Sequence, residues 1–223
     1  DGWTGNVSLI ESELTKPLRW RKPRVVALNW MGDLFHESVP DEAIARVFAV
    51  MALCPQHKFL VLTKRAKRMR EDLSQGPFNG YTGGRTTPIL ETAKALALKN
   101  DYDGYAALGR FSDGPLATLG LGVSAEDQER ADERIPDLLA TPAAMRVVSV
   151  EPMLEPIAET LRDHLADPEP CDGCGGTHML SSEACHQTPD KPMAFRGLDW
   201  VIVGGESGPG ARPIAEEWVV DLR

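Results

Sequence analysis

The sequence lacks any apolar run that approaches the roughly 20 residues of a membrane-spanning helix. Its start also lacks the succession of charged, apolar and small residues that marks a signal peptide. We therefore exclude a membrane protein and a membrane partner. Because a reducing compartment is the simpler assumption for such a chain, we expect a cytoplasmic protein.

Cysteine is scarce, with four residues among 223. Cys54 follows an apolar helical pattern, and we expect it to be packed in the core. The other three stand close to two histidines in an irregular segment: Cys171, Cys174, His178, Cys185 and His186. Three thiolates and one imidazole form the closed tetrahedral set of structural zinc, so we predict a zinc knuckle with His178 or His186 as fourth ligand. Free thiols, a disulfide and a catalytic Cys-His pair are the alternatives.

Excess positive charge is also absent. A net charge of −9 disfavours a protein whose whole surface binds nucleic acid, because nonspecific binding depends on many phosphate contacts. Two local basic clusters are present nevertheless, one around Trp20 and one after an apolar run: Lys16, Arg19, Arg21, Lys22 and Arg24, then Lys64, Arg65, Lys67, Arg68 and Arg70. They are either solvated faces or contacts for phosphate or nucleic acid.

Five short runs rich in Val, Ile and Leu recur along the chain. They span 25–30, 59–63, 119–124, 146–150 and 200–204. Near-continuous apolar runs are typical of parallel strands covered by helices. Because 223 residues suit one sizeable core, we predict a single α/β domain over 1–223.

Helical patterns follow the first, third and fifth runs. Their predicted starts are capping pairs or a proline in the first turn, at Ser38 with Asp41, Ser124 with Asp127, and Pro213. Thr141-Pro142 marks the end of the second helix. Because the chain begins with Asp1 and ends within the third pattern, we expect both termini to be truncated.

Two further segments read as irregular insertions. The first, 76–114, contains a short amphipathic helix near Ala93. The second, 163–197, is rich in Pro, Gly, Cys and polar residues, lacks a sustained period, and holds the predicted zinc knuckle.

Polar, ionisable or glycine residues follow every predicted strand. In parallel α/β folds, ligands bind at the carboxyl ends of the strands, where loops diverge and helix N-termini point inward. The candidates, in chain order, are Asp33, His36, Lys64, Arg65, Ser124, Glu151, Gly204, Gly205, Glu206, Ser207 and Arg212. Turn and capping chemistry is the alternative explanation for Ser124 and Asp33 taken singly.

Two carboxylates are the strongest catalytic candidates. Glu151 directly follows an apolar run and precedes Pro152, which fixes the backbone, and Glu206 lies in a glycine-rich loop that permits close approach of a ligand. The loop 204–212 ends in Arg212 and suits a phosphate or carboxylate. It matches neither a Walker loop nor the dinucleotide fingerprint, and a tight turn without ligand is the alternative.

Six motifs in this order resemble one family. They are PLRWRKPR (17–24), MGDLFHE (31–37), LTKR (62–65), LGVS (121–124), SVEP (149–152) and VGGESGPGARP (203–213). Together they resemble the phage gp-thirty-seven/gp-sixty-eight family over nearly the whole chain outside the two insertions. The resemblance implies a partial (β/α) barrel of radical S-adenosylmethionine type, with a [4Fe–4S] cluster held by an upstream three-cysteine motif. That motif is absent from this sequence.

The resemblance also implies roles for the strand-end residues. Asp33, Ser124 and Glu151 would contact S-adenosylmethionine, while Lys64, Arg65 and Arg212 would hold an anion, with the protein modifying a nucleotide, a nucleic acid or another phage or host target. For a phage-encoded protein, the compartment is the host cytoplasm. Because the family's activity is undefined, the resemblance implies architecture better than substrate.

Two other functions are compatible with the same residues. One is a nuclease or phosphotransfer enzyme that uses Asp33, His36, Glu151 and Glu206 around a divalent metal. The other is a noncatalytic module whose zinc insertion and basic clusters bind nucleic acid or a host protein.

Overall fold

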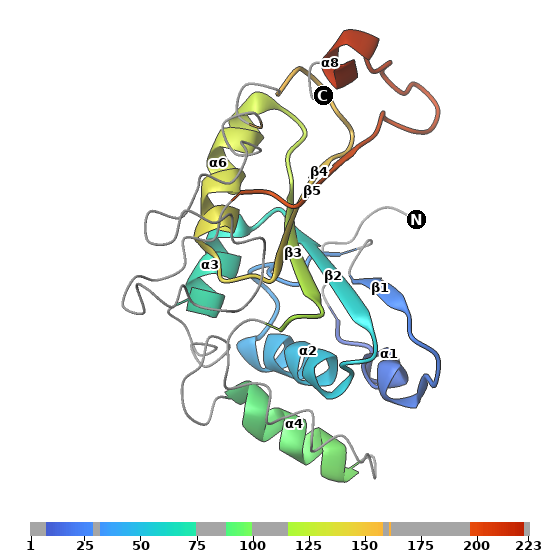
Figure 1. Ribbon diagram of the computed structural model, residues 1–223, viewed down its shortest axis with the longest axis vertical. Helices are drawn as coiled ribbons and strands as arrows, with labels where there is room; N and C mark the ends of the chain where they lie inside the picture. The colour runs from blue at the N-terminus through green and yellow to red at the C-terminus, as the bar shows by residue number, and fades with distance from the viewer. Residues whose placement is uncertain are drawn as a thin grey trace, which may run out of the picture.

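Five parallel strands form one sheet at the centre of the molecule (Figure 1). The computed structural model describes residues 8–28, 32–74, 88–99, 116–157, 161 and 197–220. The strands are β1 Val25–Leu28, β2 Lys58–Thr63, β3 Leu119–Ser124, β4 Met145–Val150 and β5 Trp200–Val203. All five predicted strands are therefore confirmed.

Helices precede β1, connect β1 through β4, and follow β5 in the described residues. They are α1 Glu11–Leu14, the 3-10 helix η1 Lys16–Arg19, α2 Asp41–Leu53, α3 Ala66–Ser74, α4 Pro88–Lys99, α6 Gln128–Ala140 and α8 Glu216–Val220. Helix α3 packs on α6, and α2 packs on α4 (Figure 1). The predicted helix near Ala93 is confirmed as α4.

The strands follow one another across the sheet in the order β1-β2-β3-β4-β5. Right-handed crossovers between successive parallel neighbours place their connecting helices on one face of a sheet. A doubly wound sheet would need a reversal of strand order, and the described strands have none. The described part is a singly wound α/β sheet, the arrangement expected for part of an α/β barrel.

The two faces of the sheet differ. The helix-facing side is apolar and contains one buried arginine, Arg146, whose guanidinium donates to the carbonyl oxygens of Leu138 and Thr141 at the end of α6. On the other face, a Cβ at Gly122 would lie 2.5 Å from Leu62 Cδ2 and 2.7 Å from the Val147 carbonyl oxygen. A side chain does not fit there, so glycine allows three strands to pack closely on this face.

The predicted helix starts need correction. Helix α2 is capped by Pro40 without a side-chain hydrogen bond, so Ser38 is not a capping residue. Ser124 is the last residue of β3, and Asp127 alone caps α6 by accepting from the Arg130 amide at 2.8 Å. Pro213 precedes α8 rather than lying in its first turn.

Other predictions lie partly or wholly outside the described residues. The zinc ligands Cys171, Cys174, His178 and Cys185, together with His186, fall there, as do residues 29–30 of the first run. Cys54 is fully buried at the end of α2, as predicted. None of the helices in the described ranges has the length and apolar character to cross a membrane.

Candidate functional site

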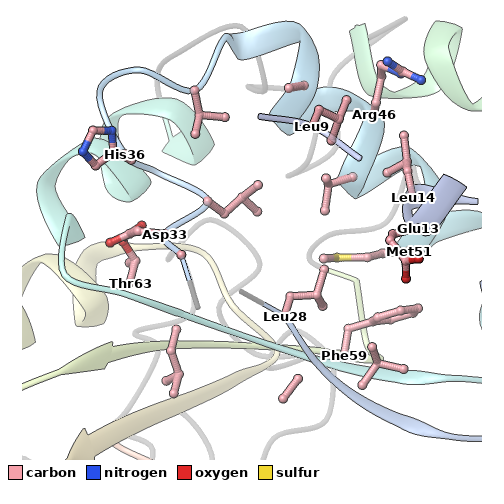
Figure 2. Close-up of a pocket in the computed structure, with 18 of the residues that line it drawn as sticks. Leu9, Glu13, Leu14, Leu28, Asp33, His36, Arg46, Met51, Phe59 and Thr63 are labelled. Carbon is pink, nitrogen blue, oxygen red and sulfur yellow. The ribbon is translucent and has the colours of Figure 1, made fainter. Parts of the chain in front are cut away.

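A cleft of about 1390 Å³ runs along the β1 side of the sheet. One end is lined by Lys16 and Trp20, and the other lies at the carboxyl ends of the strands. Figure 2 shows the transition from apolar side chains such as Leu28 to polar ones such as Asp33. The strand-end part of the cleft is lined by Asp33, His36, Thr63, Lys64, Arg65, Ser124, Ser149 and Glu151.

Asp33 connects the loop after β1 to the end of β2 through side-chain hydrogen bonds. Its Oδ1 accepts from the Phe35 amide at 2.9 Å and from Thr63 Oγ1 at 2.6 Å, and the Asp33 and Thr63 side chains face each other in Figure 2. Its Oδ2 accepts from the Lys64 amide at 2.9 Å and from Arg65 at 3.2 Å. Each oxygen of the Asp33 carboxylate therefore accepts two hydrogen bonds, and Asp33 holds the strand-end loops in place. The predicted contact of Asp33 with a cofactor would have to displace one of these donors.

Glu126 bridges β2, β3 and α6. One of its oxygens pairs with Lys64 Nζ, and the other accepts from Arg134 at 3.1 Å. Arg134 also donates to the Ser124 carbonyl oxygen at 2.7 Å. Burial acts to raise the pKa of the Glu126 carboxyl, but the hydrogen bond from Lys64 and the charges of Lys64 and Arg134 outweigh it, so its pKa lies below the ordinary value.

Glu151 has a different environment. Its side chain is exposed, and Ser149 Oγ donates to its Oε2 at 2.9 Å. A Cβ at Gly204 would lie 2.6 Å from Glu151 Oε1, so the glycine at the end of β5 leaves room for this carboxylate. Ser124 and Ser149 are register partners on β3 and β4, which brings both hydroxyl-bearing residues to the same level of the sheet.

The charges at the strand ends are paired, with one exception. Lys64 and Arg134 share Glu126, and Arg65 lies 3.2 Å from Asp33 and 3.5 Å from Glu37. Among the described residues, no lysine or arginine lies within ion-pair distance of Glu151. Within the described ranges, the strand-end part of the cleft thus presents one carboxylate, Glu151, without a cationic partner.

Glu206 and Arg212 form a separate pair. Arg212 donates three hydrogen bonds to the Glu206 carboxylate, from its amide at 2.8 Å and its guanidinium at 2.9 and 3.1 Å. These bonds lower the pKa of Glu206 to about 2. The turn between them requires glycine at Gly208 and Gly210, whose φ angles are 102° and 81°.

The structure therefore gathers some predicted site residues and separates others. Asp33, His36, Lys64, Arg65, Ser124 and Glu151 line one cleft, and Gly204 leaves the space that the Glu151 carboxylate occupies. Glu206 and Arg212 are outside the cleft lining and bind each other, while Gly205 and Ser207 belong to the same exposed loop. Among the described residues, no three His, Cys, Asp or Glu side chains are grouped to hold a metal ion.

Four residues that organise the site were not predicted from the sequence: Thr63, Glu126, Arg134 and Ser149. Thr63, Glu126 and Ser149 lie at or just after strand ends, so their positions in the sequence could have identified them as site residues. Arg134 lies inside α6, and nothing in its spacing shows that it reaches back to Glu126.

The whole chain, residues 1–223, matches the family described as "Protein of unknown function (DUF5131)". The chain belongs to this family. No curated protein and no solved structure matches it. The family description carries no activity, so the functional argument rests on the site.

Proposed function

We propose that this protein is a barrel-type enzyme of the radical S-adenosylmethionine-like class, and that Glu151 binds the cationic amine of S-adenosylmethionine. The observation that carries the proposal is the exposed Glu151 carboxylate, which lines the cleft without a cationic partner among the described residues. A carboxylate in that situation favours a ligand that brings its own positive charge.

The ligand's chemistry matches the surroundings of Glu151. S-adenosylmethionine carries an ammonium and a carboxylate at the end of its methionine portion, and a central sulfonium joins that portion to the ribose and adenine. Ser149 donates to Glu151 and so orients its carboxylate, while Ser124 adds polar lining beside it. The apolar wall at Leu60 and Leu62 suits the less polar part of the ligand.

The residues in hand do not fit an iron–sulfur cluster. Such clusters need several thiolates, and the cysteine in the described ranges, Cys54, is buried at the end of α2, away from the cleft lining. No step of this proposal is therefore derived through a cluster. The proposal concerns recognition of the cationic ligand by this chain's own residues.

A nucleotide or nucleic acid is the substrate class that the resemblance implies. Lys64 and Arg65, the cations predicted to hold an anion, are already engaged by Glu126 and Asp33. A phosphate there would share these cations with the carboxylates, so the cleft supports cation binding more directly than anion binding.

Calorimetric titration of the full chain with S-adenosylmethionine tests the proposal. We expect binding by the wild-type protein and an affinity loss of about 10-fold or more for Glu151→Gln, because a hydrogen bond to a charged group contributes about 1.5–3 kcal/mol. Glu206→Gln is the matched control, since the same change falls outside the cleft lining, and its affinity should stay within about twofold. No binding by the wild-type protein, or equal losses for both variants, would overturn the proposal.

A further inference from the structure

The two basic clusters of the sequence have different surroundings in the structure. In the cluster that follows β2, every cation has a carboxylate partner within 4.0 Å: Lys64, Arg65, Lys67, Arg68 and Arg70 pair with Glu126, Asp33, Glu71, Asp41 and Asp137 respectively. This cluster is electrostatically compensated. It offers little unbalanced positive charge to an anionic partner.

The cluster around Trp20 is not compensated. Lys16 pairs with Glu13 at 2.6 Å, but Arg19, Arg21, Lys22 and Arg24 are exposed and have no carboxylate partner in the described part of the chain. Lys58 joins them, because its amide donates to the Arg24 carbonyl oxygen at 2.8 Å and its exposed side chain has no carboxylate partner among the described residues. We call these five residues, Arg19, Arg21, Lys22, Arg24 and Lys58, the basic surface.

Unpaired positive charge is concentrated at the basic surface. Of the other solvent-accessible lysines and arginines in the described ranges, all but Lys99 lie within ion-pair distance of a carboxylate. On a chain with net charge −9, five uncompensated cations in one location oppose the overall field.

The backbone that carries these cations is held firmly. Pro17 and Leu18 are buried, and the buried His57 ring lies 3.2 Å from the Pro17 carbonyl oxygen through Nε2. Trp20 meets His57 edge to face at 5.6 Å, and the Arg24 guanidinium lies 4.6 Å from the centre of the Trp20 ring. These contacts fix the segment before a ligand arrives, which reduces the entropy lost on binding.

We propose that the basic surface binds the phosphate backbone of a nucleic-acid strand. Three of its five cations are arginines, whose planar guanidinium groups match phosphate oxygens bidentately. Cations interleaved with an aromatic residue, as around Trp20, are the composition of nucleic-acid binding surfaces. An acidic protein segment is the competing partner, and the test below separates the two.

The basic surface is distinct from the strand-end site. Arg24 and Lys58 stand at the amino ends of β1 and β2, whereas Glu151 and Lys64 stand at carboxyl ends. At about 3.3 Å per residue, Lys58 and Lys64 are about 20 Å apart along β2. The inference therefore does not depend on ligand binding at Glu151.

Fluorescence anisotropy of the full chain with labelled single-stranded and duplex oligonucleotides, over a series of KCl concentrations, tests the proposal. We expect log Kobs to fall with log[salt] with a slope magnitude of about 2–4, as for three to five phosphate contacts. The double variant Arg21→Gln/Lys22→Gln should bind about 10-fold more weakly and lose about 1–2 units of that slope.

The matched control is Lys67→Gln/Lys94→Gln, which changes net charge equally but removes cations that already have carboxylate partners. Its affinity should stay within about twofold of wild type. Both double variants should retain the thermal midpoint of the wild-type protein and its behaviour toward S-adenosylmethionine. Absence of binding at low salt, equal losses for the two double variants, or equally effective competition by polyglutamate would overturn the proposal.

Discussion

At the scale of single residues, the site is defined by which charges are paired. Among the described residues, Glu126 pairs with Lys64 and Arg134, Asp33 accepts four hydrogen bonds, and Glu151 accepts one, from Ser149. A carboxylate with many donors positions its neighbours. Glu151, which has one serine donor in the described part of the chain, is therefore the carboxylate in the strand-end part of the cleft that is left available to bind a cationic ligand.

Arg134 tests the positioning role of the Glu126 bridge. Arg134→Met keeps the aliphatic stem but removes the donors to Glu126 and to the Ser124 carbonyl oxygen. We expect a loss of about 1–3 kcal/mol in the free energy of unfolding, because partly buried acceptors lose their partner. Urea denaturation measures this loss.

Arg130→Met is the control on the same helix. Arg130 also pairs with a glutamate, Glu133, but at the surface, where such pairs contribute about 0–1 kcal/mol. Equal losses for Arg134→Met and Arg130→Met would show that burial of the Glu126 bridge has no energetic consequence.

At the scale of elements, the strands could be predicted and the helix starts could not. The strands are continuous apolar runs, and the burial of β2, β3 and β4 on both faces of the sheet demands that composition. Capping depends on backbone geometry at one residue. Ser38 with Asp41 fits the capping-box spacing, yet the Ser38 amide instead donates to His36 Nδ1 at 3.1 Å in the loop before α2.

Helix α3 was overlooked for a related reason. Its buried residues are Ala66, Met69 and Leu73, one per turn, and the intervening positions are charged or polar. Because the apolar stripe is narrow, the sequence of this segment indicates a basic cluster more clearly than it indicates an amphipathic helix. In the structure the stripe faces α6, and the arginines lie beside it and bind carboxylates.

The caps of α2 and α6 give a direct comparison. Asp127→Ala should lower the free energy of unfolding by about 1 kcal/mol, because Asp127 accepts from the Arg130 amide in the first turn. Ser38→Ala should change it by less than about 0.5 kcal/mol, because Ser38 caps nothing. Thermal or urea unfolding of both variants checks this, and an equal loss at Ser38 would contradict the assignment of the caps.

At the scale of the whole molecule, sequential winding explains why residues far apart in the chain meet at one edge. Lys64 and Glu126 are 62 positions apart, and they meet because β2 and β3 are parallel neighbours. The sequence predicted that the strand ends would be polar and that a site would lie there. It could not predict which charges neutralise one another, because that depends on side-chain reach between different strands.

The same limit applies to the basic clusters. Both look alike in sequence, and only their folded surroundings distinguish a compensated cluster after β2 from an uncompensated surface around Trp20. Glu206 and Arg212 show the converse case. Two residues predicted to bind ligand are close in space, but each satisfies the other.

The most direct test of the central claim is whether Glu151 recognises the positive charge of the ligand. Affinities of the wild-type protein and Glu151→Gln should be measured for S-adenosylmethionine and for 5′-methylthioadenosine, which lacks both the amino-acid portion and the sulfonium charge. The account predicts a loss of about 10-fold for S-adenosylmethionine and less than about twofold for 5′-methylthioadenosine. Equal losses for the two ligands, or none for either, would contradict it.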